Sequence, residues 1–350
     1  MTLEKTSQAQ RAFSKEVTLA MKGIAVILMV FHHLFYCSPE LMQRFQVSAA
    51  PLPQDKLVAL SALSKLCVAM FVFLSAYGMT LSCPRDGGRE VSVAAFRRYR
   101  RLAFGFGIVY LLGLLTSFLR EGGISLYFTQ GLGKGLLFIL LDGMGLASFF
   151  STPTLNETWW YMSVAILLIF VLPLFVRLYD SFGACVLAAA AMYSYFGLPF
   201  TAFTMYLFVI FLGIWAARSD LFLLLRQRLG KASSLWFLAG NGGVLLLLCL
   251  MRLKWGYEYW LDGVIALLLS LELFVLIELR GIPLRGLAFL GKHSMNIFLT
   301  HTLIFEYYFT DFIYSFRNWF LITLALLGSS LLLSIGIEAL KKIPGRVRPA

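Results

Sequence analysis

Long apolar runs alternate with short polar loops along the chain, from about residue 17 to residue 339. Runs of about 17 to 25 apolar residues are long enough for an α-helix to cross a bilayer. Backbone groups in lipid must find their hydrogen bonds within the segment, so each run is expected to be helical. The pattern predicts an all-α polytopic membrane protein with about ten transmembrane helices, at 17–37, 57–82, 102–119, 158–176, 181–196, 201–217, 234–251, 260–279, 289–309 and 319–339.

One further stretch, residues 122–150, is apolar but contains seven glycines together with Lys134 and Asp142. Each glycine weakens a helix by roughly 1 kcal/mol relative to alanine. Basic residues favour cytoplasmic loops, so their distribution helps to decide whether this stretch crosses. If it does not cross and both termini are cytoplasmic, the cytoplasmic loops hold 21 Lys and Arg and the external loops hold 7. We therefore expect 122–150 to be re-entrant or interfacial, with a complete eleventh crossing as the alternative.

The domain organisation follows from these runs. Residues 1–16 form a cytoplasmic N-terminal segment, 17–340 a single membrane domain, and 341–350 a basic cytoplasmic tail. The first apolar run is too long for an ordinary signal peptide and is expected to remain as the first span.

Composition supports a membrane protein and argues against several other classes. Hydrophobic residues make up 59% of the chain and charged residues 14%, whereas soluble domains are about a quarter charged. The net charge of +12 is spread over many loops, so no basic surface for a nucleic acid is expected. None of the five cysteines form a close pair, so neither a disulfide framework nor a metal site is indicated.

The four histidines lie in two apolar segments near the ends of the chain. His32 and His33 belong to the first, and His293 and His301 to the second. Ionisable residues inside a membrane usually mark a functional path. Lys22 precedes His33 by eleven residues, which places both on one helix face about 16.5 Å apart along the axis.

These positions suggest different roles. His33 is expected near the middle of the membrane, where a neutral imidazole can act as a general base. His301 can reach the same depth from the ninth span. His32 is expected to orient a neighbour or to be structural, and His293 to be a solvated loop residue at the interface. The alternative for His33 is a core histidine that is hydrogen-bonded to another helix.

Several motifs follow one another in order along these spans. The first is the Lys22 to His33 spacing, and the second is FVFLSAYG, from Phe71 to Gly78. Four arginines come next in FRRYRRL, where either Arg98 with Arg101 or Arg97 with Arg100 forms an Arg-x-x-Arg pair. WWYMSVAILLIFVLPL begins at Trp159, and FLGKHSMNIFLTH ends at His301.

Together these motifs resemble the acyltransferase family 3 of membrane proteins, over roughly residues 17–310. The resemblance implies an O-acyltransferase that moves an acyl group, often acetyl, onto a sugar of a cell-surface or exopolysaccharide. It also implies a bacterial cytoplasmic membrane. Many members carry a glutamate where this chain has Ala165. Acetyl-CoA is the implied co-substrate, and neither a permanently bound cofactor nor a metal is expected.

The arginine cluster is the expected binding site for the coenzyme A phosphates, which bidentate arginine suits. Arg98 with Arg101 is the preferred register, because Leu102 follows. An orientation signal and contact with anionic lipids are alternative roles that do not exclude phosphate binding.

The expected acceptor site lies at the start of the fourth span. Trp160, Tyr161 and Glu157 are candidates to bind a glycan or a lipid-linked sugar, with Asn156 as a further hydroxyl-binding candidate. Ser75, in the second motif, completes the expected substrate-binding set. The alternative for the aromatic residues is an interfacial belt.

Two points of function stay open from the sequence. His33 can activate the acceptor hydroxyl for direct transfer, or it can carry the acyl group itself as an acyl-histidine. A multi-span transporter or flippase of a lipid-linked sugar is the main alternative, although no inverted repeat supports it. A glycan polymerase or ligase is a third possibility.

Overall fold

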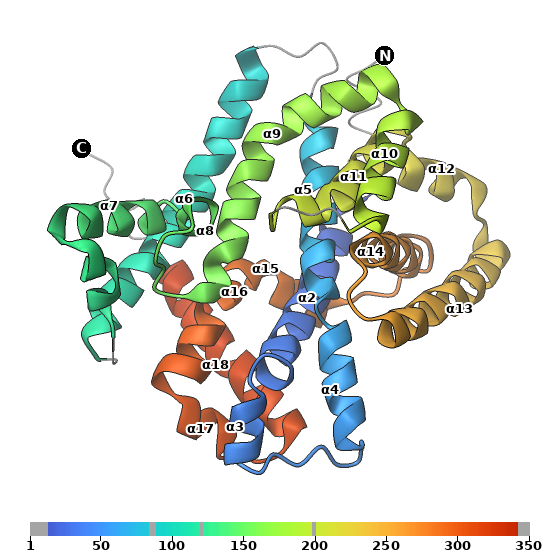
Figure 1. Cartoon of the computed structure of the whole chain (residues 1–350). Helices are drawn as coiled ribbons and strands as arrows, with labels where there is room; N and C mark the ends of the chain where they lie inside the picture. Colours follow the sequence, from blue (N-terminus) through green and yellow to red (C-terminus); the bar gives the residue numbers. More distant parts are fainter. Residues whose placement is uncertain (1–12, 84–88, 120–121, 198–200, 342–350) are drawn as a thin grey trace, which may run out of the picture. The chain divides into compact units, whose positions relative to one another are not determined.

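The computed structural model describes residues 13–83, 89–119, 122–197 and 201–341 (Figure 1). Within these ranges every named element is a helix, and the β-type pairing is one isolated bridge between Ser48 and Asn318. The expectation of an all-α protein is therefore confirmed. Most of the N-terminal segment 1–16 and nearly all of the tail 341–350 lie outside the described residues.

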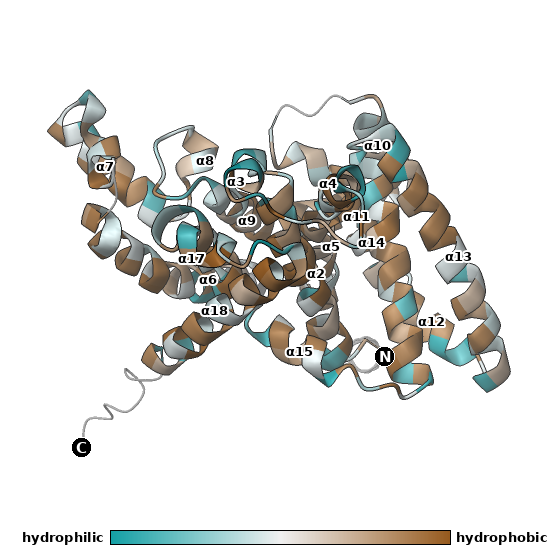
Figure 2. Ribbon diagram, turned by 90° about the horizontal axis from the view of Figure 1, so that it is seen from below, coloured by the Kyte–Doolittle hydropathy of each residue, from teal (hydrophilic) through white to brown (hydrophobic). Residues whose placement is uncertain are grey.

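Seven helical spans in the described part of the chain are long and apolar enough to cross a membrane. Hydrophobic residues cover most of their length (Figure 2). The spans are α2 (Lys15–Phe35), α4 (Gln54–Leu63) with α5 (Leu66–Leu81), α6 (Arg89–Thr116) with η1 (Ser117–Leu119), η3 (Glu157–Trp159) with α9 (Trp160–Phe182), α13 (Lys231–Trp255), α14 (Tyr259–Phe274) with η5 (Val275–Leu279), and α18 (Trp319–Leu340).

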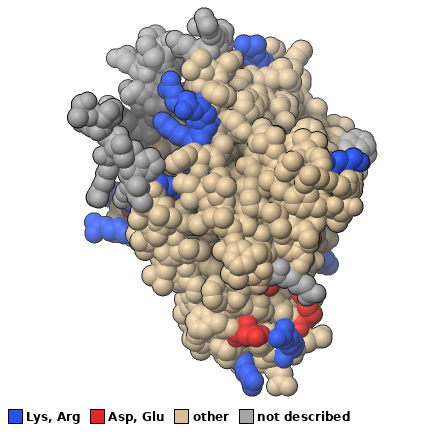
Figure 3. All heavy atoms as spheres, turned by 90° about the vertical axis from the view of Figure 1, so that its left-hand side faces the viewer, with Lys and Arg blue, Asp and Glu red and all other residues tan. Residues whose placement is uncertain are grey.

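An eighth span is possible if α11 (Leu207–Arg218) and α12 (Leu221–Arg228), which meet at a bend of 52°, count together. On the face shown in Figure 3, acidic and basic side chains occupy only small parts of the surface. A chain with this many apolar helices is a multi-pass membrane protein.

Helices also occupy the two remaining expected spans, but in shorter pieces. The first piece, α10 (Ala184–Tyr195), has 12 residues, or about 18 Å at 1.5 Å per residue. The stretch around 289–309 is divided into α15 (Arg285–Lys292), α16 (Ser294–Thr302) and the π-helical η6 (Leu303–Tyr308). The figure of ten spans thus stays a prediction, and length alone supports seven or eight.

The glycine-rich stretch 122–150 forms three short helices. They are η2 (Ile124–Gln130), α7 (Leu132–Gly143) and α8 (Ala147–Phe150). Even α7, with 12 residues, covers only about 18 Å of the roughly 30 Å hydrocarbon core. No helix in this stretch is long enough to cross a bilayer by itself, and the re-entrant or interfacial placement of the stretch stays a prediction.

The described chain forms two compact units. The first contains residues up to His32, Ala59–Val93 and Phe170–Lys292, and the second contains His33–Val58, Ala94–Ile169 and the residues from His293 onward.

Within the first unit, α5 packs against α11 and α14, and α13 lies beside α14 (Figure 1). A buried ion pair joins the last two helices, because Arg252 donates to the carboxylate of Asp262 at 2.5 Å. The expected spans 234–251 and 260–279 place Arg252 in the loop between them. The structure instead continues α13 to Trp255, so the arginine needs a partner inside the helix pair.

The first unit also contains a very close helix crossing between α2 and α15. A side chain on Gly23 would overlap the carbonyl of Leu287, and one on Gly291 would overlap the carbonyl of Leu19. Small residues let helix backbones approach in this way. The crossing places α15 against the turn of α2 that carries Lys22.

The second unit is built around α6, α16, α18 and the first half of α9. Its core combines aromatic and aliphatic side chains from all four helices, including Phe106, Tyr110, Trp159, Leu299 and Ile337. Helix α3 (Pro39–Arg44) and helix α17 (Thr310–Tyr314) also belong to this unit.

Replacing Gly291 with alanine tests the close crossing. The added methyl group has no room beside Leu19, so we expect a loss of about 1 to 3 kcal/mol of stability. The thermal unfolding midpoint in detergent should fall. Gly286→Ala, on the same helix but with no atom near the added methyl group, should unfold at or above the wild-type temperature. Equal midpoints for the two variants would contradict the crossing.

Candidate active site

Two histidines of the second unit lie side by side. Nδ1 of His33, near the end of α2, is 3.1 Å from Nε2 of His301 in α16. Their ring centroids are 4.8 Å apart. His301 is fully buried, whereas His33 is half-buried. The structure thus brings together two residues that are 268 positions apart in the chain.

Two hydrogen bonds hold the end of α2 that carries His33. The hydroxyl of Ser38 donates to the carbonyl of His33, and the hydroxyl of Tyr314 donates to the carbonyl of Leu34. The last carbonyls of a helix have no partner within it, so these side chains cap α2 and hold His33 in place.

The contacts of His301 determine the tautomers of the pair. Its Nδ1 is 2.8 Å from the carbonyl oxygen of Phe298 and 3.2 Å from that of Ile297. Carbonyl oxygens only accept hydrogen bonds, so Nδ1 carries the proton. In neutral His301 the Nε2 atom is then the acceptor, and His33 donates to it through Nδ1. Neutral His33 consequently bears its lone pair on Nε2.

A polar chain extends from His301 to the start of α9. Nε2 of His301 is 3.2 Å from the hydroxyl of Thr302, which is 2.9 Å from the hydroxyl of Thr158. Thr158 donates to Oδ1 of Asn156 through both its backbone N–H and its hydroxyl. Asn156 is the N-cap of η3, a position that asparagine favours because its side chain accepts from the first free N–H groups.

Trp159 belongs to the core of the unit and not to an interfacial belt. Its Nε1 donates to the carbonyl of Leu299 at 3.0 Å. Its ring meets Phe106 of α6 edge-on, with centroids 5.1 Å apart. The hydrogen bond to Leu299 ties the segment before α9 to the turn of α16 that precedes His301.

Beside this segment lies a cavity of about 310 Å³. Trp160 lines it, and Glu157 contributes an exposed carboxylate. Tyr161 packs edge-on against Phe298, with centroids 5.8 Å apart. The other lining residues are Asp142, Gly145, Ala147, Ser148, Ser151, Thr154 and Trp159.

Asp142 is a buried acid at the edge of this cavity. It accepts from the hydroxyl of Tyr127 at 2.5 Å, from the backbone N–H of Leu155 at 2.8 Å and from the hydroxyl of Thr154 at 2.9 Å. Burial raises the pKa of Asp142, and the three hydrogen bonds offset part of this effect. Burial and the nearby carboxylate also raise the pKa of Tyr127, which keeps the phenol protonated as a donor.

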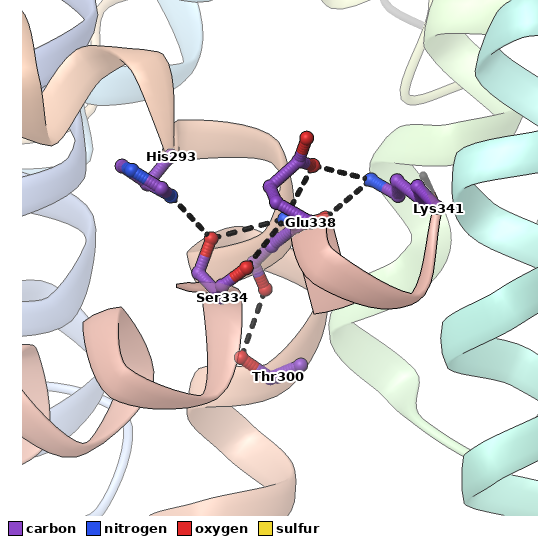
Figure 4. A network of polar contacts seen from close by, with 6 residues as sticks. His293, Thr300, Ser334, Glu338 and Lys341 are labelled. Atoms are coloured by element: carbon purple, nitrogen blue, oxygen red, sulfur yellow. Dashed lines mark hydrogen bonds and ion pairs between the residues drawn. The ribbon is translucent and has the colours of Figure 1, made fainter. Parts of the chain in front are cut away.

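A second polar network anchors α16 to α18 (Figure 4). Nδ1 of His293 is 2.8 Å from the hydroxyl of Ser334. Asn296 donates to Ser334 and Glu338, and Lys341 donates to Asn296 and Glu338. The expectation that His293 is a solvated loop residue is wrong. The histidine is 5% exposed, because α16 begins beside α18 and buries its first turn.

The four expected phosphate-binding arginines lie on the first half of α6. Arg97, Arg100 and Arg101 are exposed, and Arg98 is half-buried. One turn beyond Arg101, the Nζ atom of Lys341 approaches Gly105 of the same helix. Positive charge therefore gathers on this half of α6.

Three other predicted residues belong to the first unit. Lys22 lies on α2, which runs unbroken from Lys15 to Phe35. Ser75 is half-buried on α5. His32 donates from Nδ1 to the carbonyl of Ser61 at 2.8 Å. This hydrogen bond to another helix is a structural contact, which is one of the two roles expected for His32.

Sequence reasoning missed Thr158, Thr302 and the buried role of Asp142. An Asn-x-Thr pattern just before a helix is a capping signal, which could have placed Thr158. Thr302 follows His301 directly in the chain. Asp142 carried no comparable signal, because its partners come from separate short segments.

A known protein family matches the chain. The model of the family described as "Acyltransferase domain" matches residues 20–339, nearly the whole chain. No curated protein and no solved structure matches the chain. The matched region contains both histidines, the arginine cluster and the cavity. The protein therefore belongs to the acyltransferase family 3 and is a membrane-bound acyltransferase.

Proposed function

We propose that the protein transfers an acetyl group from acetyl-CoA to a hydroxyl of a cell-surface or exopolysaccharide sugar. The observation that carries this proposal is the oriented His33–His301 pair. A histidine whose Nδ1 donates to a fixed acceptor presents Nε2 as a base. Membership of an acyltransferase family supplies the reaction class.

His33 acts as the general base in this proposal. Its Nε2 takes the proton of the acceptor hydroxyl while the oxygen attacks the thioester carbonyl carbon. The carbon–sulfur bond then breaks, and the departing sulfur receives the proton from His33. The products are the sugar ester and the free thiol of coenzyme A. Ala165 stands where many members have a glutamate, so in this chain the partner of the base is His301.

The donor binds through the arginines of α6. Coenzyme A carries several phosphate groups, and guanidinium groups bind phosphates in a bidentate manner. Phe106 follows Arg98 by eight residues, or about 12 Å along α6. The ring of Phe106 in turn touches Trp159. The pantetheine arm can therefore run along α6 toward the segment that contacts His301.

The acceptor, a glycan or a lipid-linked sugar, binds in the cavity beside α9. Its lining combines the ring of Trp160 with the carboxylate of Glu157 and several hydroxyl groups. Aromatic faces and hydroxyl-binding groups of this kind suit sugar rings. Tyr161 remains a further candidate for contact with the acceptor, and the role expected of Ser75 stays a prediction.

We place the protein in a bacterial cytoplasmic membrane with both termini inside, in line with the distribution of its basic residues. The arginines of α6 then face the cytoplasm, where acetyl-CoA is present. The acceptor enters from the outer side, and acetyl transfer takes place between the two.

His33→Ala tests the base. We expect acetyl transfer to fall by about 10²- to 10⁴-fold, the usual contribution of a positioned general base. Purified protein would receive radiolabelled acetyl-CoA and crude surface glycan, and label on the glycan would be counted. His32→Ala, which removes the neighbouring structural histidine, is the control and should retain more activity. Equal transfer by wild type and His33→Ala would exclude His33 as the base.

His301 acts as a positioning residue that holds the tautomer of His33. His301→Leu removes the acceptor for Nδ1–H, so kcat should fall by about 10²-fold or more. His301→Gln can place a carbonyl oxygen near the same position and should recover part of the rate. If both variants lose the same activity and the same thermal stability, His301 has only a structural role.

The arginine pair predicts a selective effect on the donor. Arg98→Ala with Arg101→Ala removes two charge-assisted contacts worth about 1.5 to 3 kcal/mol each. The KM for acetyl-CoA should rise at least 10-fold, while the KM for the acceptor changes little. Arg97→Ala with Arg100→Ala is the matched double variant for the other register. If the KM for acetyl-CoA rises more in this second variant, Arg97 with Arg100 is the phosphate-binding pair. If only the KM for the acceptor rises, the arginines do not bind the donor.

A further inference from the structure

The side-chain amide of Asn156 is buried with one half of its hydrogen-bonding capacity unused. Asn156 as a whole is 0% exposed to solvent. Oδ1 accepts from the backbone N–H and the hydroxyl of Thr158, at 3.1 and 2.8 Å. A backbone N–H only donates, so the oxygen must lie on this side and Nδ2 on the other. Among the described residues, Nδ2 has no hydrogen-bond partner.

An unpartnered buried donor is uncommon in folded proteins and calls for an explanation. Capping alone does not provide one, because serine or aspartate at the N-cap would accept from the same N–H groups. Asn318, the N-cap of α18, performs the same task at a half-buried position. The amide nitrogen of Asn156 therefore points to a ligand that supplies an acceptor.

The location of the amide relates it to the histidine pair. Thr158 holds Oδ1 of Asn156 and also contacts Thr302, whose hydroxyl is 3.2 Å from Nε2 of His301. His301 in turn accepts from His33. Four consecutive contacts, each between 2.8 and 3.2 Å, thus connect the amide to the base within the second unit.

We propose that Nδ2 of Asn156 donates to the carbonyl oxygen of the acyl donor and stabilises the oxyanion that forms there. This inference rests on the acyl transfer proposed above. When the acceptor oxygen bonds to the carbonyl carbon, its proton moves to Nε2 of His33 and the π electrons move to the carbonyl oxygen. When the carbonyl re-forms, the carbon–sulfur bond breaks and the sulfur takes the proton from His33.

The chemistry of the amide favours the acyl carbonyl over the acceptor hydroxyl. Nδ2 is a donor only. A donor directed at the attacking oxygen would draw electron density from it and make it a weaker nucleophile. A donor directed at the carbonyl oxygen strengthens as negative charge develops, and a buried site magnifies this effect.

Two substitutions separate this role from helix capping. Asn156→Asp and Asn156→Ser both retain an oxygen at the N-cap but lose the amide donor. We expect kcat to fall by about 10²- to 10³-fold in both, the usual loss for one oxyanion donor, with the KM for acetyl-CoA near the wild-type value. Asn318→Asp makes the same change at the N-cap of α18 and should leave kcat unchanged.

Hydrolysis of acetyl-CoA without glycan provides the second readout. An oxyanion donor assists attack by water as well as by a sugar, so hydrolysis and transfer should fall by the same factor. The inference is overturned if transfer falls while hydrolysis is unchanged, because the amide then binds the acceptor. It is also overturned if kcat stays at the wild-type level, or falls only as far as the folded fraction measured by thermal unfolding.

The same experiment keeps the two proposals apart. Wild-type protein that neither transfers nor hydrolyses the acetyl group rejects the proposed acyl transfer itself. Wild-type activity that is lost in His33→Ala but retained in both Asn156 variants rejects only the oxyanion role.

Discussion

The hydrogen bond from Nδ1 of His301 to the carbonyl of Phe298 controls the chemistry available to the site. A backbone carbonyl cannot donate, so this contact assigns the proton of His301 and, through Nε2, the proton of His33. The two protons cannot move to the opposite ring nitrogens unless the hydrogen bond between His301 and Phe298, both in α16, is broken. A helix backbone, not a carboxylate, thus sets the orientation of the base that we propose, in a chain that has Ala165 where many family members carry a glutamate.

Several contacts within the second unit hold α16 at that position. Trp159 donates to Leu299 two residues before His301, and Thr158 contacts Thr302 one residue after it. At the other end of α16, Asn296 is tied to Ser334 and Glu338 of α18. These contacts matter because α16 has only nine residues before the π-helical η6 follows. A helix this short depends on tertiary contacts for its stability.

The sequence was informative where a single residue type carries the signal. Apolar runs located every long helix, and the four histidines and the family motifs singled out His33 and His301. Partnerships were harder to foresee. The apolar pattern predicts a loop position for Arg252, yet the side chain is buried against Asp262. His293 reads as solvated, yet it contacts Ser334. Local patterns describe one helix at a time, whereas these residues are defined by the helix that packs beside them.

The three hydrogen bonds to Asp142 have a consequence for the segment between α8 and α9, which lines part of the cavity. Residues 154 and 155 are tied to this carboxylate, and residues 158 and 159 to α16. A loop anchored on both sides has already lost its conformational entropy when the chain folds. A ligand that meets such a wall does not have to order it, so more of the contact energy is left to hold the ligand in place.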